Sequence, residues 1–312
     1  MSSSRIVSVF GATGVQGSAV IDRLLKDGSF SPRAITRNPD SEAASKLKSQ
    51  GIEIAKGDAG DKASLVDALR GSEAVFMMTL PVVPEFGGKG PGEVTQGKNI
   101  IDAAKEVGVK FIIFTSLPDV SKLSGGKYAD NIPGHSDKQI VQEYLKSSGI
   151  DYTVFYLGGF LENFLSPPGP RNFMRKTDTG YNIVVPLYSA ESLATFTWIQ
   201  RDLAESTLAV LKNYTDTSKG ISGMAYPLVT ANILYPALAE IFAKGLGVEV
   251  KFTTGPPSGI SMLDNMFAVR SENDGLPEFK ENAVPNPSLV ALGAKFGTVE
   301  EFVETELKRR YQ

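Results

Sequence analysis

The sequence predicts an α/β protein built on an open, doubly wound parallel sheet. Short apolar runs rich in β-branched and aromatic residues alternate with longer helix-like segments through the first half of the chain. These runs are apolar nearly throughout, which is typical of parallel strands that helices cover on both faces. Right-handed crossovers between such strands produce the doubly wound arrangement.

The first half of the chain is expected to contain strands and helices in strict alternation. The strands are expected at Arg5–Phe10, Pro32–Arg37, Ile52–Gly57, Ala74–Thr79, Lys110–Ser116 and Asp151–Leu157. The helices are expected at Val15–Lys26, Ser41–Ser49, Lys62–Leu69, Glu93–Val107 and Asp137–Ser148. Parallel neighbours need a crossover between them, so this alternation suits a parallel sheet.

The second half breaks this rhythm. Ser166–Pro170, SPPGP, is expected to be an exposed loop, because proline neither continues a helix nor donates to a sheet. Helices are expected at Leu203–Lys212, at Ala231–Leu246 with Thr230 as N-cap, and at Val299–Arg309. A strand is expected at Glu249–Gly255, with irregular connections from there to Pro287.

The length of 312 residues and the change of rhythm predict two domains. Residues 1–157 form the first, and residues 158–312 form a smaller α/β portion. The boundary is soft, because a later strand can return to the main sheet.

Composition excludes several classes of function. The chain has no cysteine, which removes disulfides and thiolate chemistry, and one histidine, so no metal site is expected. The formal net charge of −3 disfavours direct nucleic-acid binding. No apolar run reaches the roughly 18 residues of a membrane span, and no signal peptide or lipid-anchor motif is found. We expect a soluble protein of the cytoplasm, with the nucleus as a second location.

The segment GATGVQG joins the first expected strand to the first expected helix. Gly11 permits a tight turn, Gly14 lets a diphosphate approach the backbone, and Gly17 lets the helix pack closely on the strand. Unpaired N–H groups at the helix start then face the phosphates. This order indicates a dinucleotide site that also includes Thr13 and Gln16. The alternative is three glycines at an ordinary turn.

The end of the second expected strand indicates which dinucleotide binds. NAD sites usually present an acid to the ribose 2′-hydroxyl about 20 residues after the glycine turn. Here AITRNP places Arg37 there, and Asp40 lies beyond Pro39. A guanidinium can bind a 2′-phosphate, so NADP(H) is expected over NAD(H). The alternative is a solvated arginine. Asp58 is expected to bond the adenine amino group, or else to be a turn or N-cap residue.

One phosphate-loop pattern is rejected. GEVTQGKN has the spacing but ends in Asn99, so the hydroxyl that would hold magnesium is missing. It also follows a Gly/Pro loop instead of a strand, and kinase or ATPase chemistry is therefore not expected. Gln96 and Lys98 are expected on the first turn of a helix near the dinucleotide.

Candidate reactive residues lie around the fourth to sixth strands. Thr79 and Ser116 end strands at the carboxyl edge, where open α/β sheets bind ligands. Lys138 is expected to hold the nicotinamide ribose and lower the pKa of a neighbouring acid. His135 is a candidate general acid near neutral pH, or else a helix-capping residue.

The segment GGFLENF follows the sixth strand. Phe160 is expected to stack on the nicotinamide, with a place in the core as the alternative. Glu162 or Asn163 is expected to face the ligand.

These segments together resemble the NmrA-like family, which belongs to the atypical short-chain dehydrogenases/reductases. The resemblance rests on GATGVQGSAV, TRNP, GDAGD, the Gln96-Gly97-Lys98 helix start, the Lys138 helix and GGFLENF. It is strongest over residues 5–165. It implies a Rossmann domain, a small C-terminal domain and bound NADP(H). Members include redox-sensing regulators that bind a protein partner such as a transcription factor, and reductases of small molecules.

The chain departs from the superfamily at one position. Active short-chain dehydrogenases carry tyrosine four residues before the active-site lysine, and this chain has Gly134 there. Tyr128 is farther upstream. The departure favours a redox sensor that engages a protein partner according to its bound cofactor. The alternative is an NADPH-dependent reductase of a small carbonyl or enone substrate, in which Lys138 or His135 replaces the tyrosine. Relatives of the isoflavone-reductase type, which rely on lysine, support that alternative.

Overall fold

A seven-stranded parallel sheet forms the centre of the computed structural model, which describes residues 5–82, 88–120, 124–125, 127, 132–167 and 172–312. In spatial order the strands are β3 (Glu53–Lys56), β2 (Ser31–Thr36), β1 (Ile6–Val9), β4 (Ala74–Met77), β5 (Phe111–Ser116), β6 (Asp151–Leu157) and β11 (Met224–Leu228). All neighbouring pairs run parallel. This doubly wound order confirms the fold class predicted from the sequence.

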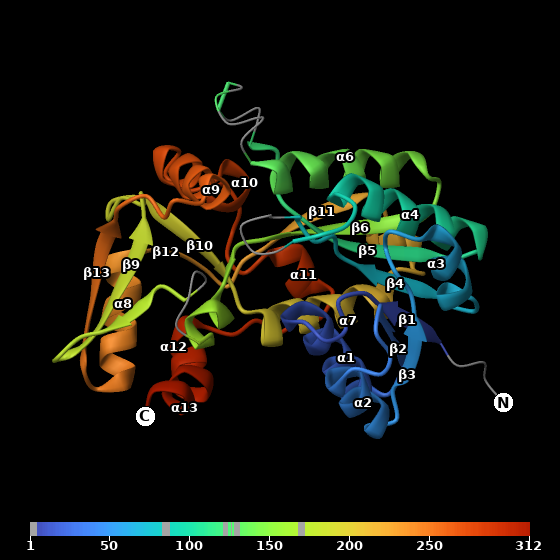
Figure 1. The fold of residues 1–312 in the computed structure, drawn as a ribbon, viewed down its shortest axis with the longest axis horizontal. Coiled ribbons are helices and arrows are strands. Elements are labelled where there is room, and N and C mark those ends of the chain that lie inside the picture. Colours follow the sequence, from blue (N-terminus) through green and yellow to red (C-terminus); the bar gives the residue numbers. More distant parts are fainter. Residues whose placement is uncertain (1–4, 83–87, 121–123, 126, 128–131, 168–171) are drawn as a thin grey trace.

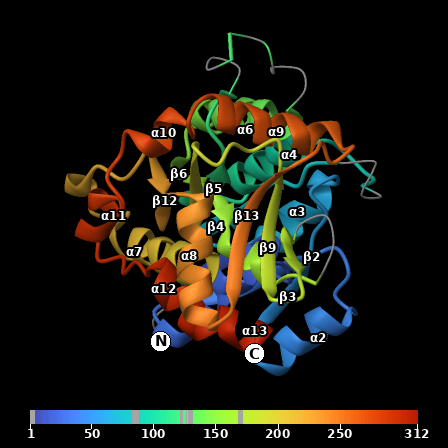
Figure 2. The same cartoon turned by 90° about the vertical axis from the view of Figure 1, so that its left-hand side faces the viewer.

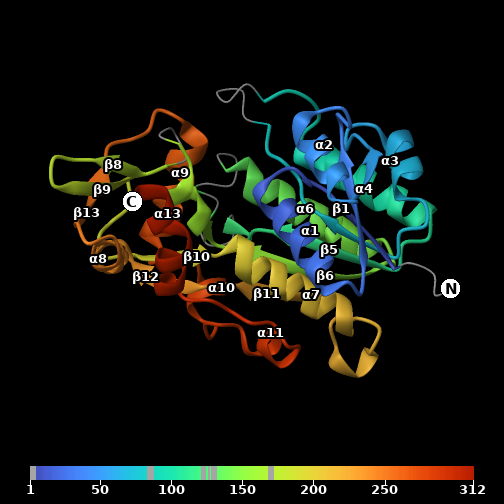
Figure 3. The same cartoon turned by 90° about the horizontal axis from the view of Figure 1, so that it is seen from below.

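Helices cover both faces of the sheet (Figures 1 and 3). One face carries α1 (Val15–Asp27), α2 (Glu42–Ser49) and α7 (Ala204–Asn213). The opposite face carries α3 (Lys62–Leu69), α4 (Glu93–Glu106) and α6 (Pro133–Ser147). Successive residues of a central strand belong alternately to the two cores. In β5, for example, Phe111 packs on the α1 side and Ile112 on the α4 side. Burial on both faces explains why the strands are apolar throughout.

The later part of the chain contributes to this sheet. Strand β11 pairs with β6 from Met224 beside Thr153 to Leu228 beside Leu157, and it is the returning strand that the sequence analysis allowed for. Helix α7 packs beside α1 in the same core. The division into domains at residue 157 stays a prediction about folding units.

Most of the remaining second half surrounds a separate core (Figure 2). It contains two three-stranded sheets: β7 (Gly159–Phe160), β10 (Leu193–Thr197) and β12 (Ala231–Leu234), and β8 (Met174–Lys176), β9 (Gly180–Pro186) and β13 (Glu249–Gly255). The α-helices are α8 (Tyr235–Leu246), α9 (Ser261–Glu272), α10 (Pro277–Lys280), α11 (Pro287–Ala291), α12 (Val299–Phe302) and α13 (Lys308–Tyr311). Shorter turns are the 3₁₀ turns η2 (Leu161–Leu165) and η4 (Thr217–Lys219) and the π-helical turns η3 (Ile199–Leu203) and η5 (Val303–Leu307). Of these elements, η3 and α11 pack against the core of the main sheet, and α10 packs in a small third cluster.

Three expected elements differ from the structure. The helix expected at Ala231–Leu246 begins only at Tyr235, because Pro236 has no N–H to donate inside a helix and favours its first turn. The preceding residues form β12, which pairs with β10. Thr230 is therefore not an N-cap; its hydroxyl bonds the N–H of Trp198 and the buried carboxylate of Asp202. Helix α9 lies where irregular connections were expected, and α6 begins at Pro133 instead of Asp137. Residues 168–170 of the expected loop lie outside the described residues.

Candidate functional site

The glycine turn after β1 has the backbone geometry of a dinucleotide site. Gly11 has a φ of 63°, in the left-handed region that favours glycine, and its carbonyl accepts a bond from the Gly14 N–H at 2.8 Å. A Cβ on Gly17 would lie 2.3 Å from the Gly11 oxygen, so only glycine lets α1 pack this closely. A Cβ on Gly14 would meet only that oxygen, at 3.3 Å, within a radius of 4 Å. Apart from that one oxygen, the space beside Gly14 is open.

Helix α1 starts at this turn with free donors. Its N-cap is Gly14, which has no side chain to occupy the first N–H groups. Thr13 is exposed beside them, and the Oε1 atom of Gln16 is buried with no hydrogen-bond partner in the described chain. A helix start of this kind fits a bound diphosphate.

Strand register brings Arg37 and Asp58 to the same edge as the turn. Ala34 of β2 pairs with Val9 of β1, so Arg37 lies just beyond the strands beside the glycine turn. Arg37 is exposed, and no hydrogen bond or ion pair of its side chain is found within the described ranges. Asp58 follows β3 and is exposed; its Oδ1 accepts a bond from the Gly60 N–H at 2.8 Å. It is thus a turn residue, and Asp61 is the N-cap of α3.

A buried ion pair lies at the carboxyl ends of β4 and β5. The Lys138 ammonium of α6 bonds the carboxylate of Glu93, the first residue of α4. The Lys138 Nζ also donates to the Thr79 carbonyl at 3.0 Å and to the Thr79 hydroxyl at 2.9 Å. The Thr79 hydroxyl in turn donates to Glu93 Oε1 at 2.8 Å. The Glu93 side chain is 1% exposed and that of Lys138 is 12% exposed, so the charges face each other in a largely dry environment.

The second oxygen of Glu93 has no partner. Glu93 Oε2 is buried without a hydrogen bond in the part of the chain that the structure describes. A Cβ on Gly134 would lie 3.4 Å from it. A carboxylate from another helix therefore lies beside the position where active short-chain dehydrogenases carry tyrosine. Tyr128, the other tyrosine considered, lies outside the described residues.

Sequence reasoning missed Glu93. The available signal is the acid at the first position of α4, directly after the N-cap glycine, in the helix predicted at Glu93–Val107. The two residues expected near the dinucleotide, Gln96 and Lys98, differ in position. Gln96 holds the backbone of Leu80 at both its N–H and its carbonyl, at 3.0 and 2.9 Å, and so fixes the loop after β4. Lys98 lies in the second turn of α4 and stacks on the Tyr144 ring, away from the strand ends.

His135 is anchored in the interior. Its Nδ1 bonds the Pro118 carbonyl at 2.8 Å, and since a carbonyl only accepts, Nδ1 carries the proton. Burial, reinforced by the Arg270 charge, lowers the pKa of His135 to about 3, so the ring is neutral at pH 7. These surroundings argue against His135 as a general acid near neutral pH. It is not a cap either, because the helix N-cap is Ile132.

The remaining candidates lie at the edges of β5 and β6. Ser116 ends β5, and its buried Oγ has no partner in the described chain. Phe160, in β7, is half-buried and packs partly against the core on the α1 side. Asn163 is half-buried in η2, whereas Glu162 is buried and accepts a bond from the Gln200 N–H at 2.7 Å. Orphaned polar atoms at Gln16 and Ser116 and the open Gly14 are features that a bound dinucleotide would use.

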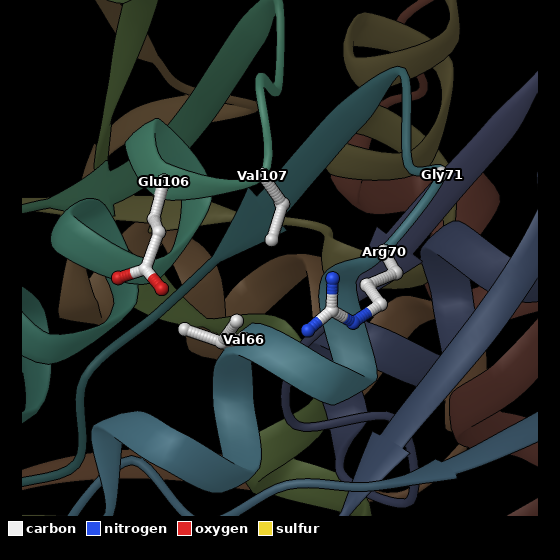
Figure 4. A pocket seen from close by; sticks show the side chains of 5 residues that line it. All are labelled: Val66, Arg70, Gly71, Glu106 and Val107. Carbon is white, nitrogen blue, oxygen red and sulfur yellow. The ribbon is translucent and has the colours of Figure 1, made fainter.

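A surface cavity of about 440 Å³ lies elsewhere (Figure 4). It is lined by Val66, Arg70, Gly71, Glu106 and Val107, where α3 and α4 end. This is the amino-terminal edge of the parallel strands, opposite the glycine turn, so we assign it no part in the site. Over the described ranges, no helix has the length and apolar character of a membrane span, and no group of three or more His, Asp or Glu side chains is placed to hold a metal ion.

Comparison with known proteins gives one family. The model of the NmrA-like family matches residues 3–303. The NmrA-like family domain-containing oxidoreductase ptmS of Penicillium ochrochloron is 30% identical over 87% of this chain and 85% of its own length. The corresponding oxidoreductase notA of Aspergillus sp. (strain MF297-2) is 38% identical over 62% of this chain. The match spans 60% of the length of notA.

Solved structures share the fold over nearly the whole chain. The NADPH-dependent quinone oxidoreductase QOR2 of Escherichia coli, complexed with NADPH, is 25% identical with a TM-score of 0.70 and covers 95% of this chain and 98% of its own. The negative transcriptional regulator NmrA, in complex with NADP, is 20% identical with a TM-score of 0.79 and covers 99% and 97%. At that identity the likeness to NmrA shows the fold alone.

Proposed function

This chain belongs to the NmrA-like family, and on that premise we propose that it is an NADP(H)-dependent oxidoreductase in which Lys138 handles the developing charge. The observation that carries the proposal is the buried pair of Lys138 and Glu93 at the carboxyl ends of β4 and β5. Burying two charges is costly, and the pair lies where open α/β sheets bind their ligands. The names of the curated relatives support the same class of activity.

NADP(H) is the cofactor that the residues fit. The free N–H groups at the start of α1 would bind the diphosphate beside Gly14. Arg37 would bind the 2′-phosphate, and Asp58 would lie near the adenine. QOR2, complexed with NADPH, supports this cofactor for a related chain.

To contact a ligand, Lys138 has to give up one of its present hydrogen bonds. Bound NADPH supplies the hydride. All three Nζ donors of Lys138 are occupied, by the Thr79 carbonyl, the Thr79 hydroxyl and Glu93. A ribose hydroxyl or substrate oxygen therefore has to replace one of them. The Thr79 hydroxyl is the partner most easily released, because it keeps its own bond to Glu93. Lys138 then faces the ligand while Glu93, a positioning residue, keeps the ammonium in place.

The test is steady-state NADPH oxidation with a panel of aldehydes, ketones and enones. We expect at least one substrate with a turnover number of about 1–10³ s⁻¹. Lys138→Met should lower kcat by about 10²–10⁴-fold, the usual contribution of a proton donor. Glu93→Gln should lower kcat more than it raises KM and leave NADPH affinity unchanged. Lys98→Met is the matched control, because Lys98 stacks on Tyr144 away from the strand ends.

The outcomes separate two functions. A kcat that survives Lys138→Met contradicts the proposed role of Lys138. NADPH binding without turnover on any substrate contradicts the oxidoreductase proposal and favours the redox-sensor interpretation, which stays a prediction. That interpretation requires different conformations with NADP⁺ and NADPH, measurable as different proteolysis rates of the two loaded forms.

A further inference from the structure

Arg270 is a cation for which the described residues supply no counter-ion. It lies near the end of α9, and its half-buried side chain takes part in no hydrogen bond or ion pair among the described residues. Its Nε atom is fully buried and unpartnered. Burial lowers the pKa of Arg270, and the charged and titratable groups that act on it most are the hydroxyls of Tyr188 and Tyr235. No described residue provides the carboxylate that usually accompanies a charge removed from water.

His135 presents a second unpartnered group near this guanidinium. Its Nδ1–H is bonded to the Pro118 carbonyl, which leaves Nε2 as an acceptor. That Nε2 atom is buried and unpartnered in the described chain, and the whole residue is 1% exposed. Val269, next to Arg270, packs in one buried cluster with Ile132, three residues before His135. In agreement with this packing, the charge of Arg270 is among the causes that lower the pKa of His135. Together they offer a cationic donor and a neutral acceptor.

Aromatic rings stand beside the guanidinium. Tyr188 and Tyr235 meet edge to face at 5.1 Å, and Tyr188 donates its hydroxyl bond to the Leu193 carbonyl at 2.6 Å. The rings give the guanidinium an apolar wall that would exclude water from an anion bound there. Low local polarity strengthens a charge-assisted bond.

The fold brings Arg270 to the same edge as Lys138. The neighbouring Val269 packs in one cluster with Val120, which follows β5, and with Ile132, the N-cap of α6. Figures 1 and 2 show α9 beside the amino-terminal end of α6. On α6, His135 and Lys138 are three residues apart and so occupy neighbouring turns of one face. A ligand held by Arg270 would therefore lie near Lys138.

We propose that Arg270 and His135 bind the polar end of the substrate, and that the substrate is a carboxylic acid carrying a neighbouring hydroxyl group. The guanidinium binds the carboxylate, and Nε2 of His135 accepts a bond from the hydroxyl. That the bound acid is a substrate rests on the proposed oxidoreductase function. The binding of an anion at Arg270 can be tested without turnover.

The experiment is calorimetry on the NADP⁺-loaded protein with mandelate and with mandelamide, its uncharged analogue of nearly equal shape. Wild type should bind mandelate about tenfold or more tightly than mandelamide, the usual effect of one charge-assisted contact. Arg270→Met, similar in size but uncharged, should remove the difference. Arg270→Lys should keep part of it. NADPH affinity should be unchanged in both variants, and Arg70→Met, in the cavity at the opposite edge, should behave as wild type.

Thermal unfolding supplies a second measurement. Removing a partly buried charge that has no counter-ion among the described residues should leave the Tm of Arg270→Met equal to or above that of wild type. A clear fall in Tm would mean that Arg270 is paired and structural, and would overturn the proposal. Equal binding of the two probes, or no binding of either up to roughly 10 mM, would also overturn it. If mandelate binds through Arg270 and no substrate is turned over, the anion site stands and the oxidoreductase proposal fails.

Discussion

A double-mutant cycle of stability should show a large coupling free energy between Lys138 and Glu93. Removing one partner of a buried pair costs about 3–5 kcal/mol, because the other charge is left uncompensated. Lys138→Met leaves the Glu93 carboxylate, 1% exposed, with only the Thr79 hydroxyl as donor, so we expect a cost in that range. Glu93→Gln should cost less, about 2–3 kcal/mol, because Lys138 keeps both Thr79 oxygens. The double variant leaves no unpaired charge, so the coupling between the two should be about 2–3 kcal/mol.

The assay is urea unfolding of the four proteins at pH 7, read as free energies of unfolding with a common m value. The Lys308–Glu304 pair of the C-terminal helix is the matched control, because exposed pairs at this helical spacing couple by about 0.5 kcal/mol or less. A Lys138–Glu93 coupling no larger than that of the control would refute the argument. It would mean that the two charges are solvated in solution.

Three further predictions concern cofactor binding and pH. Wild type should bind NADP⁺ about tenfold or more tightly than NAD⁺, and calorimetry of Arg37→Ala should show that preference lost; a mutant that still discriminates would exclude Arg37 as the phosphate ligand. Gly14→Val should abolish dinucleotide binding with little change in Tm, because a Cβ there meets only the Gly11 oxygen at 3.3 Å; normal affinity in the folded variant would contradict the glycine-loop assignment. Burial raises the pKa of Asp202 to about 7 from an ordinary 3.8, so the protonated form is favoured on folding. The free energy of unfolding should therefore fall as pH rises from about 4 to about 7, and Asp202→Asn should flatten that slope in denaturation curves; an unchanged slope would show that Asp202 titrates normally.

The main sheet could be predicted from the sequence because its strands are buried on both faces. Ala74–Met77 is apolar throughout and Phe111–Ser116 is apolar over its first four positions, a pattern typical of parallel strands that helices cover on both faces. The second half gave weaker signals. Its sheets have three strands each, and strands such as β9 are only partly buried, so their sequence pattern is mixed. The segment ANIL precedes apolar helical residues and by pattern alone favours a helix, whereas Pro236 confines the helix start to Tyr235.

The candidate site was predictable only where chemistry is tied to a local turn. Gly11 and Gly17 could be assigned from the strand–turn–helix order alone, and the structure gives them the expected backbone and packing. Glu93 lies on α4, and Arg270, the proposed anion ligand, lies on α9. No spacing in the sequence links either residue to Lys138. Such long-range pairs depend on tertiary packing. Glycine at position 134, in place of tyrosine, indicates a missing acid. That Glu93 lies beside this position follows only from the packing of α4 against α6.

The late arrival of β11 has a consequence for synthesis. Strand β6 ends at Leu157, yet its outer neighbour is not complete until Leu228 has been made. During translation β6 is therefore the open border of a nearly finished sheet, with a row of unsatisfied N–H and carbonyl groups. Helix α7, which covers the same core as α1, also emerges late. A nascent chain stalled between these points should be prone to associate with its neighbours on the same messenger RNA, and should need a chaperone until the border strand is in place.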